Sequence, residues 1–176
     1  ADIALLEDGR PSFATGHAIG EFPLAITTVA VTSSGQGGGS MVSVDAQGVL
    51  QVGPESAGST PGPACFGRGG TRMTVTDAAL LCGILGHGAL GFGAIAPDAA
   101  LAGEVARPLA ERLGLDVATL SEGVLSVAIS GMLVPIEQLL ARAGMHASEL
   151  TLMPFGGAGP MLGALTAEAV GIARVL

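Results

Sequence analysis

Three glycine-rich loops form the pattern in this sequence that points most directly to chemistry. They lie at residues 35–40, 67–71 and 156–160. Glycine lets the backbone approach a ligand closely, and free N–H groups bind phosphate, helped by the positive end of a helix dipole. None of the loops has the lysine of a P-loop, and none matches the dinucleotide fingerprint G-x-G-x-x-G. Each loop alone is equally typical of a tight turn, but the three together favour nucleotide or phosphate binding.

Few reactive side chains accompany these loops. Asp77 opens a predicted helix, so it is either a catalytic or metal-proximal carboxylate or an N-cap. Arg68 lies in the second loop, where it could clamp a phosphate or pair with Asp77 or Glu55. Cys65 and Cys82 make neither a disulfide framework nor a zinc spacing, which predicts reduced thiols. No base neighbours Cys65 in the sequence, which disfavours a nucleophilic role.

The first segment of the chain, residues 1–75, is predicted to be rich in strands. The predicted strands cover residues 1–6, 22–32, 41–45 and 48–52. The run at 22–32 is apolar and β-branched, which is typical of a buried strand. Ala46-Gln47 separates the last two strands and predicts a hairpin. The stretch 53–73 is long and irregular, as functional or disordered loops are.

The remaining residues form a helical segment, 76–149, and a strand–turn–helix segment, 150–176. The predicted helices cover residues 78–85, 98–113, 117–143 and 160–170. Thr76 or Asp77 is the expected N-cap of the first, Gly114 ends the second, and Pro135 should kink the third. Strands at 150–155 and near Ala173 flank the last helix, which indicates an α/β protein, as one domain or part of a larger one.

Composition narrows the possible functions. The chain has 49% apolar and 12% charged residues, 29 glycines and a net charge of −8. This hydrophobicity excludes a disordered chain, and the acidic balance disfavours nucleic-acid binding. Residues 78–97 form the best candidate for a membrane span, but glycines interrupt them and no basic cluster flanks them, so we expect a short helix and a loop instead. Because no charged n-region followed by an apolar core opens the sequence, we expect no signal peptide and a cytoplasmic protein whose weakly charged surface is covered by something else.

Three stretches resemble the hydantoinase A/oxoprolinase family, which includes the ATP-binding subunits of acetone-type carboxylases. The most specific is GGGSMVSVDAQGVLQVGPESAGSTPGPACFGRGGTRMTVTDA at 37–78, joined by TLMPFGGAGPM at 151–161 and ADIALLEDG at 1–9. The resemblance implies part of an actin/sugar-kinase/Hsp70-like ATPase core, related to ribonuclease H. It also implies a complex with the remainder of an A-type chain and a B-type hydantoinase subunit.

The resemblance further implies ATP-dependent activation with Mg²⁺. Phosphorylation of a cyclic amide, or of a ketone or bicarbonate, makes a carbon electrophilic before hydrolysis or carboxylation. By this resemblance Asp2 acts on the metal or its water, against the alternative of an ordinary edge-strand residue. The run Gly37, Gly38, Gly39 and Ser40 approaches nucleotide or substrate, against the alternative of a tight β-turn. Gly156, Gly157 and Gly159 match the loop on the adenosine side.

Several positions depart from the family pattern. Phe66, Ala79, Glu137 and Leu162 replace its usual Tyr, Asn, Arg and His. The family's first phosphate loop, and the Gly-Gly-Thr before the position of Asp2, have no counterpart in the sequence. We therefore expect this chain alone not to hydrolyse ATP. Two hypotheses stay open: part of an ATP-dependent amidohydrolase or carboxylase, or a non-catalytic assembly subunit with a degenerate ATPase fold.

Overall fold

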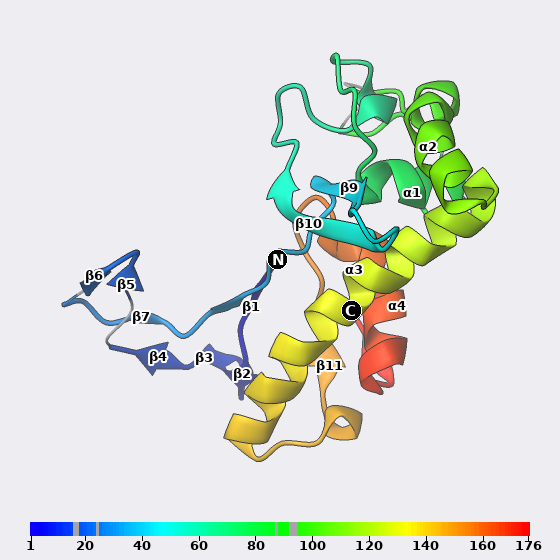
Figure 1. The fold of residues 1–176 in the computed structure, drawn as a ribbon. Helices are drawn as coiled ribbons and strands as arrows, with labels where there is room; N and C mark the ends of the chain where they lie inside the picture. Colours follow the sequence, from blue (N-terminus) through cyan, green and yellow to red (C-terminus); the bar gives the residue numbers. More distant parts are fainter. Residues whose placement is uncertain (16–17, 24, 87, 92–94) are drawn as a thin grey trace.

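The computed structural model describes residues 1–15, 18–23, 25–86, 88–91 and 95–176. Within this range the chain divides into an extended arm, residues 1–34, and a packed body, residues 35–176. Figure 1 shows the arm reaching away from the helices of the body.

The arm consists of short antiparallel strand pairs. Its strands are β1 (Asp2–Ile3), β2 (Leu6–Glu7), β3 (Arg10–Pro11), β4 (Phe13–Ala14), β5 (Ala18–Ile19), β6 (Phe22–Pro23), β7 (Thr28–Val29) and β8 (Thr32–Ser33). β1 pairs with β8, β4 with β7 and β5 with β6, so the chain runs out along one side and returns along the other. β2 and β3 form a hairpin, and in its turn Asp8 and Gly9 have φ angles of 50° and 73°. Two consecutive left-handed residues are typical of a tight hairpin turn.

The prediction of a buried strand at 22–32 is wrong. Among its described residues, the structure has parts of three short strands, and the large side chains face solvent: Phe22 is 77% exposed and Ile26 60%. The residue types favour strand structure, but no layer of the body covers this part of the chain. Phe13, on the outgoing side of the arm, is likewise 64% exposed.

The body begins with the predicted hairpin. β9 (Ser40–Val44) pairs antiparallel with β10 (Leu50–Ser56), with Val44 opposite Leu50 and Val42 opposite Val52. The carboxylate of Asp45 accepts the N–H groups of Gln47 and Val49, both at 2.9 Å. This side chain satisfies the backbone of the turn, so the hairpin closes where the sequence predicts it.

Four helices follow: α1 (Val75–Leu81), α2 (Ala99–Leu113), α3 (Val117–Ala143) and α4 (Gly159–Val170). Two short 3₁₀ turns accompany them: η1 (Ala64–Phe66) precedes α1, and η2 (Ala147–Glu149) follows α3. α2 and α3 confirm the predicted spans, because Asp98 and Asp116 cap their N-termini and Gly114 and Gly144 end them in the left-handed conformation. α1 begins three residues earlier than predicted, and its N-cap is Thr74 rather than Thr76 or Asp77.

The last segment is a small parallel unit. β11 (Thr151–Leu152) pairs with β12 (Arg174–Val175), and α4 connects them. A parallel pair joined by a helix confirms the α/β class. The strand predicted at 150–155 is shorter than expected and ends at Leu152, before a turn in which Phe155 is 79% exposed.

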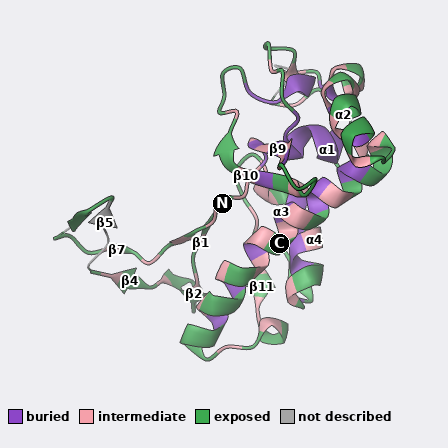
Figure 2. Ribbon diagram, in the orientation of Figure 1, coloured by how far each residue is buried: buried purple, intermediate pink, exposed green. Residues whose placement is uncertain are grey.

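The core of the body surrounds α3. Its buried residues include Leu120, Val124 and Ala128, which belong to one cluster with Val42 of β9 and Leu162 of α4. Figure 2 shows buried residues concentrated in α1, α3 and α4, while the arm is mostly exposed. The hairpin, α1, α2 and α4 thus hold a shared hydrophobic centre that positions the loops between them.

α3 is also the one helix among the described residues that is long and apolar enough to cross a membrane, with a mean hydropathy of 1.8 over its most apolar stretch. A core helix of a packed domain has the same composition, and α3 contacts α1, α2, α4 and β10. In the stretch 78–97, where the sequence offers its best candidate for a span, the described residues form the end of α1 and turns.

Candidate functional site

Two of the three predicted glycine loops lie against each other. We call residues 35–40 the hairpin loop and residues 153–158 the α4 loop. A Cβ atom built on Gly38 would lie 3.0 Å from Cβ of Ala158 and 2.7 Å from Oγ1 of Thr76. Only glycine fits at this position without displacing a neighbour. In Figure 1 the orange turn before α4 accordingly runs close to the base of the β9–β10 hairpin.

The hairpin loop contains the tight β-turn that the sequence offered as an alternative to a binding role. The N–H of Ser40 donates to the carbonyl of Gly37 at 3.0 Å, and the N–H of Gly37 donates to Oγ of Ser40 at 3.0 Å. The Ser40 hydroxyl in turn donates to the carbonyl of Gly35 at 3.1 Å. Ser40 is buried and uses its hydroxyl inside the loop, so it shapes the backbone of the turn.

The turn leaves two backbone donors available at its centre. The carbonyl of Gly38 accepts from Thr76, and the carbonyl of Gly39 accepts the N–H of Ala57 at 2.9 Å. Within the described part of the chain, the N–H groups of Gly38 and Gly39 have no hydrogen-bond partner. Buried or partly buried N–H groups are rarely left unpaired, which makes this pair a candidate for binding an anionic group.

The α4 loop presents donors in the same way. No side chain caps α4, and the N–H groups of Gly157 and Ala158 have no partner among the described residues. Gly156 has a φ of 82°, which glycine adopts easily. Gly159 would bring a Cβ within 3.4 Å of the carbonyl carbon of Pro154. Gly157 has neither a left-handed backbone nor a neighbour within 4 Å, so nothing in the described chain requires glycine there.

The third glycine loop, 67–71, is explained by local structure. Gly67 and Gly69 have left-handed φ angles, and a Cβ on Gly70 would collide with the carbonyl of Gly62. Arg68 in this loop is exposed. The partner of Glu55 is Arg72, at 3.0 Å, rather than Arg68.

Asp77 lies inside the fold and holds the start of α1. Its carboxylate accepts N–H groups from Cys65 (2.7 Å), Thr74 (2.8 Å) and Ala64 (3.3 Å), and the hydroxyl of Thr74 (2.8 Å). Thr74 and Asp77 thereby form a capping box, with Asp77 at its third helical position. Asp77 is completely buried and both of its oxygens are engaged, so the geometry favours the capping interpretation over a catalytic one. Because other donors occupy the carboxylate, Arg68 does not pair with Asp77.

Asp2 lies on the strand that adjoins the hairpin loop. It is exposed, pairs with Ser33 across β1 and β8, and accepts the Ser33 hydroxyl at 2.7 Å. The backbone nitrogen of Ala1 donates to the carbonyls of Ser34 and Gln36, which sets this strand beside the loop. Among the described residues there is no group of three or more His, Cys, Asp or Glu side chains that would hold a metal by themselves.

Cys65 is unsuited to act as a nucleophile. Burial, and the nearby carboxylate of Asp77, raise the pKa of its thiol far above the usual range. Burial likewise raises the pKa of Cys82, and both cysteines are free. Cys65 is buried and Cys82 is half-buried, and neither forms a disulfide in the structure.

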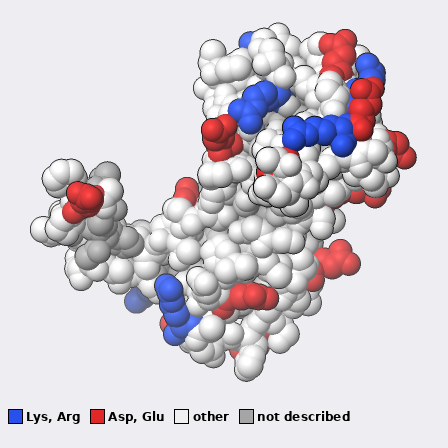
Figure 3. Space-filling model, in the orientation of Figure 1, with Lys and Arg blue, Asp and Glu red and all other residues white. Residues whose placement is uncertain are grey.

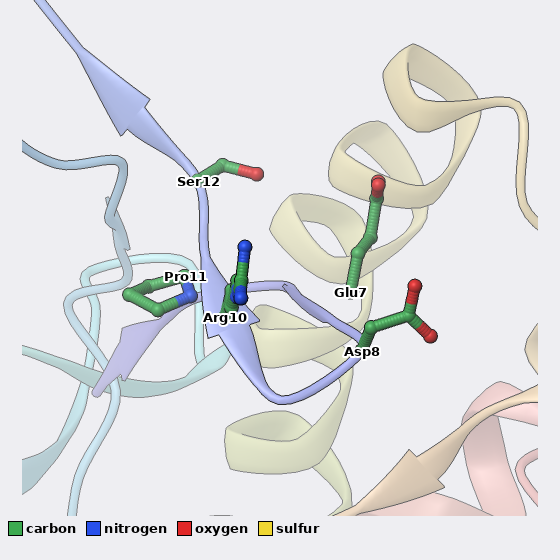
Figure 4. A pocket seen from close by; sticks show the side chains of 5 residues that line it. All are labelled: Glu7, Asp8, Arg10, Pro11 and Ser12. Carbon is green, nitrogen blue, oxygen red and sulfur yellow. The ribbon is translucent and has the colours of Figure 1, made fainter.

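Two surface hollows lie outside the hairpin loop and the α4 loop, and Gly70 and Thr71 of the third glycine loop line the second one. Figure 4 shows the first, at the β2–β3 turn of the arm, where Glu7, Asp8 and Arg10 surround an open depression. The second lies between β9 and α2, with Arg72, Glu104 and Arg112 on its rim. Figure 3 shows that charged groups are sparse over the visible face, in line with the composition.

Sequence reasoning missed one residue of this site. Thr76 was expected only as a possible N-cap, yet it donates both its N–H and its hydroxyl to the carbonyl of Gly38, each at 2.9 Å. These residues are 38 positions apart in the chain, so no local pattern reveals the contact.

The candidate site therefore consists of two glycine loops of an α/β protein that lie against each other, each with backbone N–H groups that have no partner among the described residues. A family model described as hydantoinase/oxoprolinase matches residues 1–176, and the chain belongs to this family. Caprolactamase subunit alpha of Pseudomonas jessenii is 36% identical over 176 residues, which are 99% of this chain and 25% of that protein. The acetophenone carboxylase gamma subunit of Aromatoleum aromaticum is 33% identical, over 90% of this chain and 22% of that protein.

Solved structures show the same relationship. The crystal structure of ATP-dependent caprolactamase from Pseudomonas jessenii superposes with a TM-score of 0.87 at 35% identity, over 99% of this chain and 25% of that one. The nucleotide-free structure of acetone carboxylase gives 0.86 at 26% identity, with the same coverage. The chain thus spans about a quarter of the length of these relatives.

Proposed function

We propose that this chain is part of an actin/sugar-kinase/Hsp70-like ATPase core and binds ATP between the hairpin loop and the α4 loop. The observation that carries the proposal is the close approach of Gly38 and Ala158, which places side by side two loops whose N–H groups have no partner among the described residues. Backbone N–H groups and an uncapped helix start are the donors that phosphates favour. Two structural relatives, caprolactamase and acetone carboxylase, are described as ATP-dependent, which supports ATP as the nucleotide.

The two loops have different tasks in this proposal. Gly38 and Gly39 donate to phosphate oxygens, because their N–H groups are free and fixed by a tight turn. Gly156 and Gly157 let the nucleotide lie close to the backbone on the adenosine side, where a side chain on Gly157 would project into space that the chain itself does not use. Gly37 resembles Gly157, since a Cβ there also meets nothing within 4 Å.

Magnesium is compatible with this arrangement, although the described residues contain no complete ligand set for it. Mg²⁺ commonly takes one or two carboxylates, several waters and the substrate phosphates. Asp2 is the exposed carboxylate on the strand beside the hairpin loop, and we propose that it binds the ion or orients one of its waters. Arg68 remains a candidate phosphate contact, and it is exposed and available for one.

The proposed reaction is the activation of a carbonyl oxygen by phosphorylation, with a cyclic amide, or a ketone and bicarbonate, as substrate class. ATP supplies the phosphoryl group, which turns a poor leaving group into a good one. The residues of this chain hold and orient the phosphates, while Asp77 and Thr74 keep the start of α1 rigid behind the hairpin loop. We propose that the rest of an A-type chain and a B-type subunit complete the enzyme in the cytoplasm.

The test uses the complete natural polypeptide that contains these residues, together with its partner subunit. Phosphate release from Mg-ATP is measured alone and with caprolactam, 5-oxoproline, hydantoin, or acetone plus bicarbonate. We expect one substrate class to stimulate phosphate release. If ATP binds but none of these substrates stimulates phosphate release, the proposed nucleotide site stands and the proposed substrate class is rejected. The absence of both ATP binding and ATP turnover would favour the hypothesis of a non-catalytic assembly subunit.

A further inference from the structure

We infer that Thr76 is a positioning residue for nucleotide phosphate: it fixes the orientation of the Gly38–Gly39 peptide so that the Gly39 N–H faces the ligand. The inference rests on the proposed nucleotide site and adds a residue to it. Thr76 itself touches no ligand in the proposed site. It acts through the backbone of the hairpin loop.

The contact between Thr76 and Gly38 is double. The backbone N–H and the hydroxyl of Thr76 both donate to the Gly38 carbonyl at 2.9 Å, and Thr76 is buried. Thr76 is the second residue of α1, and the N–H groups of a helical first turn have no partner inside the helix. The carbonyl of Gly38 satisfies one of them, so the hairpin loop and the start of α1 stabilise each other.

The planarity of the peptide bond carries this orientation to the next residue. In a trans peptide the C=O of one residue and the N–H of the following residue point in opposite directions. With the Gly38 carbonyl held against α1, the Gly39 N–H must point away from α1. There it has no partner in the described part of the chain, although the carbonyl of the same residue is bonded to Ala57.

The hydrogen bonds at the N-terminus of α1 explain why the contact between Thr76 and Gly38 is rigid. Asp77, the next residue, gathers four donors from the preceding turn and from η1, all of them buried. Thr76 therefore cannot shift without disturbing the capping box. A mobile hydroxyl on an exposed loop would not orient a peptide in this way.

The test compares Thr76→Val with two matched variants in the complete polypeptide and its partner. Thr76→Val keeps the shape and removes the hydroxyl, whereas Thr76→Ser keeps the hydroxyl. Ser121→Ala is the control, because Ser121 is also buried and donates its hydroxyl to a backbone carbonyl, that of Val117 at 2.7 Å, inside α3. The dissociation constants of Mg-ATP and of adenosine are measured by calorimetry, together with the unfolding temperature without nucleotide.

We expect Thr76→Val to weaken Mg-ATP binding by roughly 3- to 10-fold, the effect of one hydrogen bond, and to leave adenosine binding unchanged. Thr76→Ser should restore ATP binding to near the wild-type value. Ser121→Ala should leave ATP affinity unchanged, because Ser121 lies inside α3 and outside the two loops. Equal losses of ATP and adenosine affinity in Thr76→Val, or no loss of either, would overturn the role of Thr76.

A second measurement covers the case in which Thr76→Val does not fold. In the wild-type protein, hydrogen–deuterium exchange of the peptide that contains Gly38 and Gly39 should slow with ATP and stay unchanged with adenosine. Exchange that ATP does not slow would overturn the inference while ATP binding itself persists. A wild-type protein that binds no ATP would instead reject the proposed function, and this inference with it.

Discussion

The arm and the body use the same kinds of apolar residues to different effect. In the body, strands of five and seven residues and four helices bury their apolar side chains around α3. In the arm, the strands are two residues long and phenylalanines and isoleucine face solvent. Apolar composition therefore predicts that a segment needs cover, but it does not say which part of a protein supplies that cover.

The candidate site takes residues from both regions, and those from the body are held more firmly than the one from the arm. The hairpin loop and the α4 loop belong to the body and are held by buried residues such as Thr76 and Asp77. Asp2 belongs to the arm and is held by a two-residue ladder and the hydroxyl of Ser33. Backbone donors in the body are thus fixed in advance, whereas the carboxylate at the base of the arm has few constraints on its position.

The largest effect should come from removing a core side chain of the body. Leu120→Ala is expected to lower the free energy of unfolding by about 3 kcal/mol, because Leu120 is completely buried in the cluster around α3. Phe22→Ala, its counterpart in the arm, should change that free energy by less than about 0.5 kcal/mol. Urea unfolding of both variants makes the comparison. A loss of several kcal/mol from Phe22→Ala would mean that the arm is covered, and the contrast between the regions would fail.

A smaller effect is expected at the base of α1. Asp77→Asn should cost about 2 kcal/mol, because an amide group cannot accept all four of the donors that surround the carboxylate. Asp98→Asn is the control, since asparagine caps a helix about as well as aspartate and Asp98 is exposed. If Asp77→Asn unfolds like wild type but abolishes ATP turnover, Asp77 has the catalytic role and not the capping one.

The smallest effect concerns pH. Donation from the N–H of Thr119 holds the pKa of Asp116, the N-cap of α3, below its usual value. A depressed carboxyl pKa stabilises the fold above the pKa of the unfolded chain, about 4, and this contribution is lost as the pH falls through the folded value. Thermal unfolding between pH 7 and pH 2 should show a decline at the acid end that is shallower in Asp116→Ala. An identical acid decline in both proteins would contradict this contribution.

Much of the body could be predicted from the sequence. Asp98, Gly114 and Gly144 mark the helix ends by local chemistry, so the spans of α2 and α3 are correct. The hairpin could be predicted because two short strand-forming runs flank a two-residue turn. The exposure of residues 22–32 could not be predicted from their types, because it depends on whether another layer packs on them.

The candidate site could be predicted only loop by loop. The glycine positions are evident in the sequence, but the contact between Gly38 and Ala158 spans 120 residues of chain and depends on packing around α3. For the same reason sequence could not distinguish the loop at 67–71, whose glycines serve local geometry, from the two loops that meet. The division into segments 1–75, 76–149 and 150–176 stays a prediction.

The most direct test of the central claim is Mg-ATP binding to the complete polypeptide with Gly157→Val. A Cβ at Gly157 meets no atom within 4 Å, and its backbone is not left-handed, so the fold should tolerate the change. Gly103→Val is the matched control, because Gly103 in α2 is equally unobstructed and lies outside the two loops. Gly38→Val is less informative, since its side chain would strike Thr76 and Ala158.

We predict that Gly157→Val weakens Mg-ATP binding at least about 10-fold, a loss of about 1.4 kcal/mol, with little change in the unfolding temperature. Gly103→Val should bind Mg-ATP as the wild type does. Undiminished ATP binding by Gly157→Val would contradict the placement of nucleotide between the hairpin loop and the α4 loop.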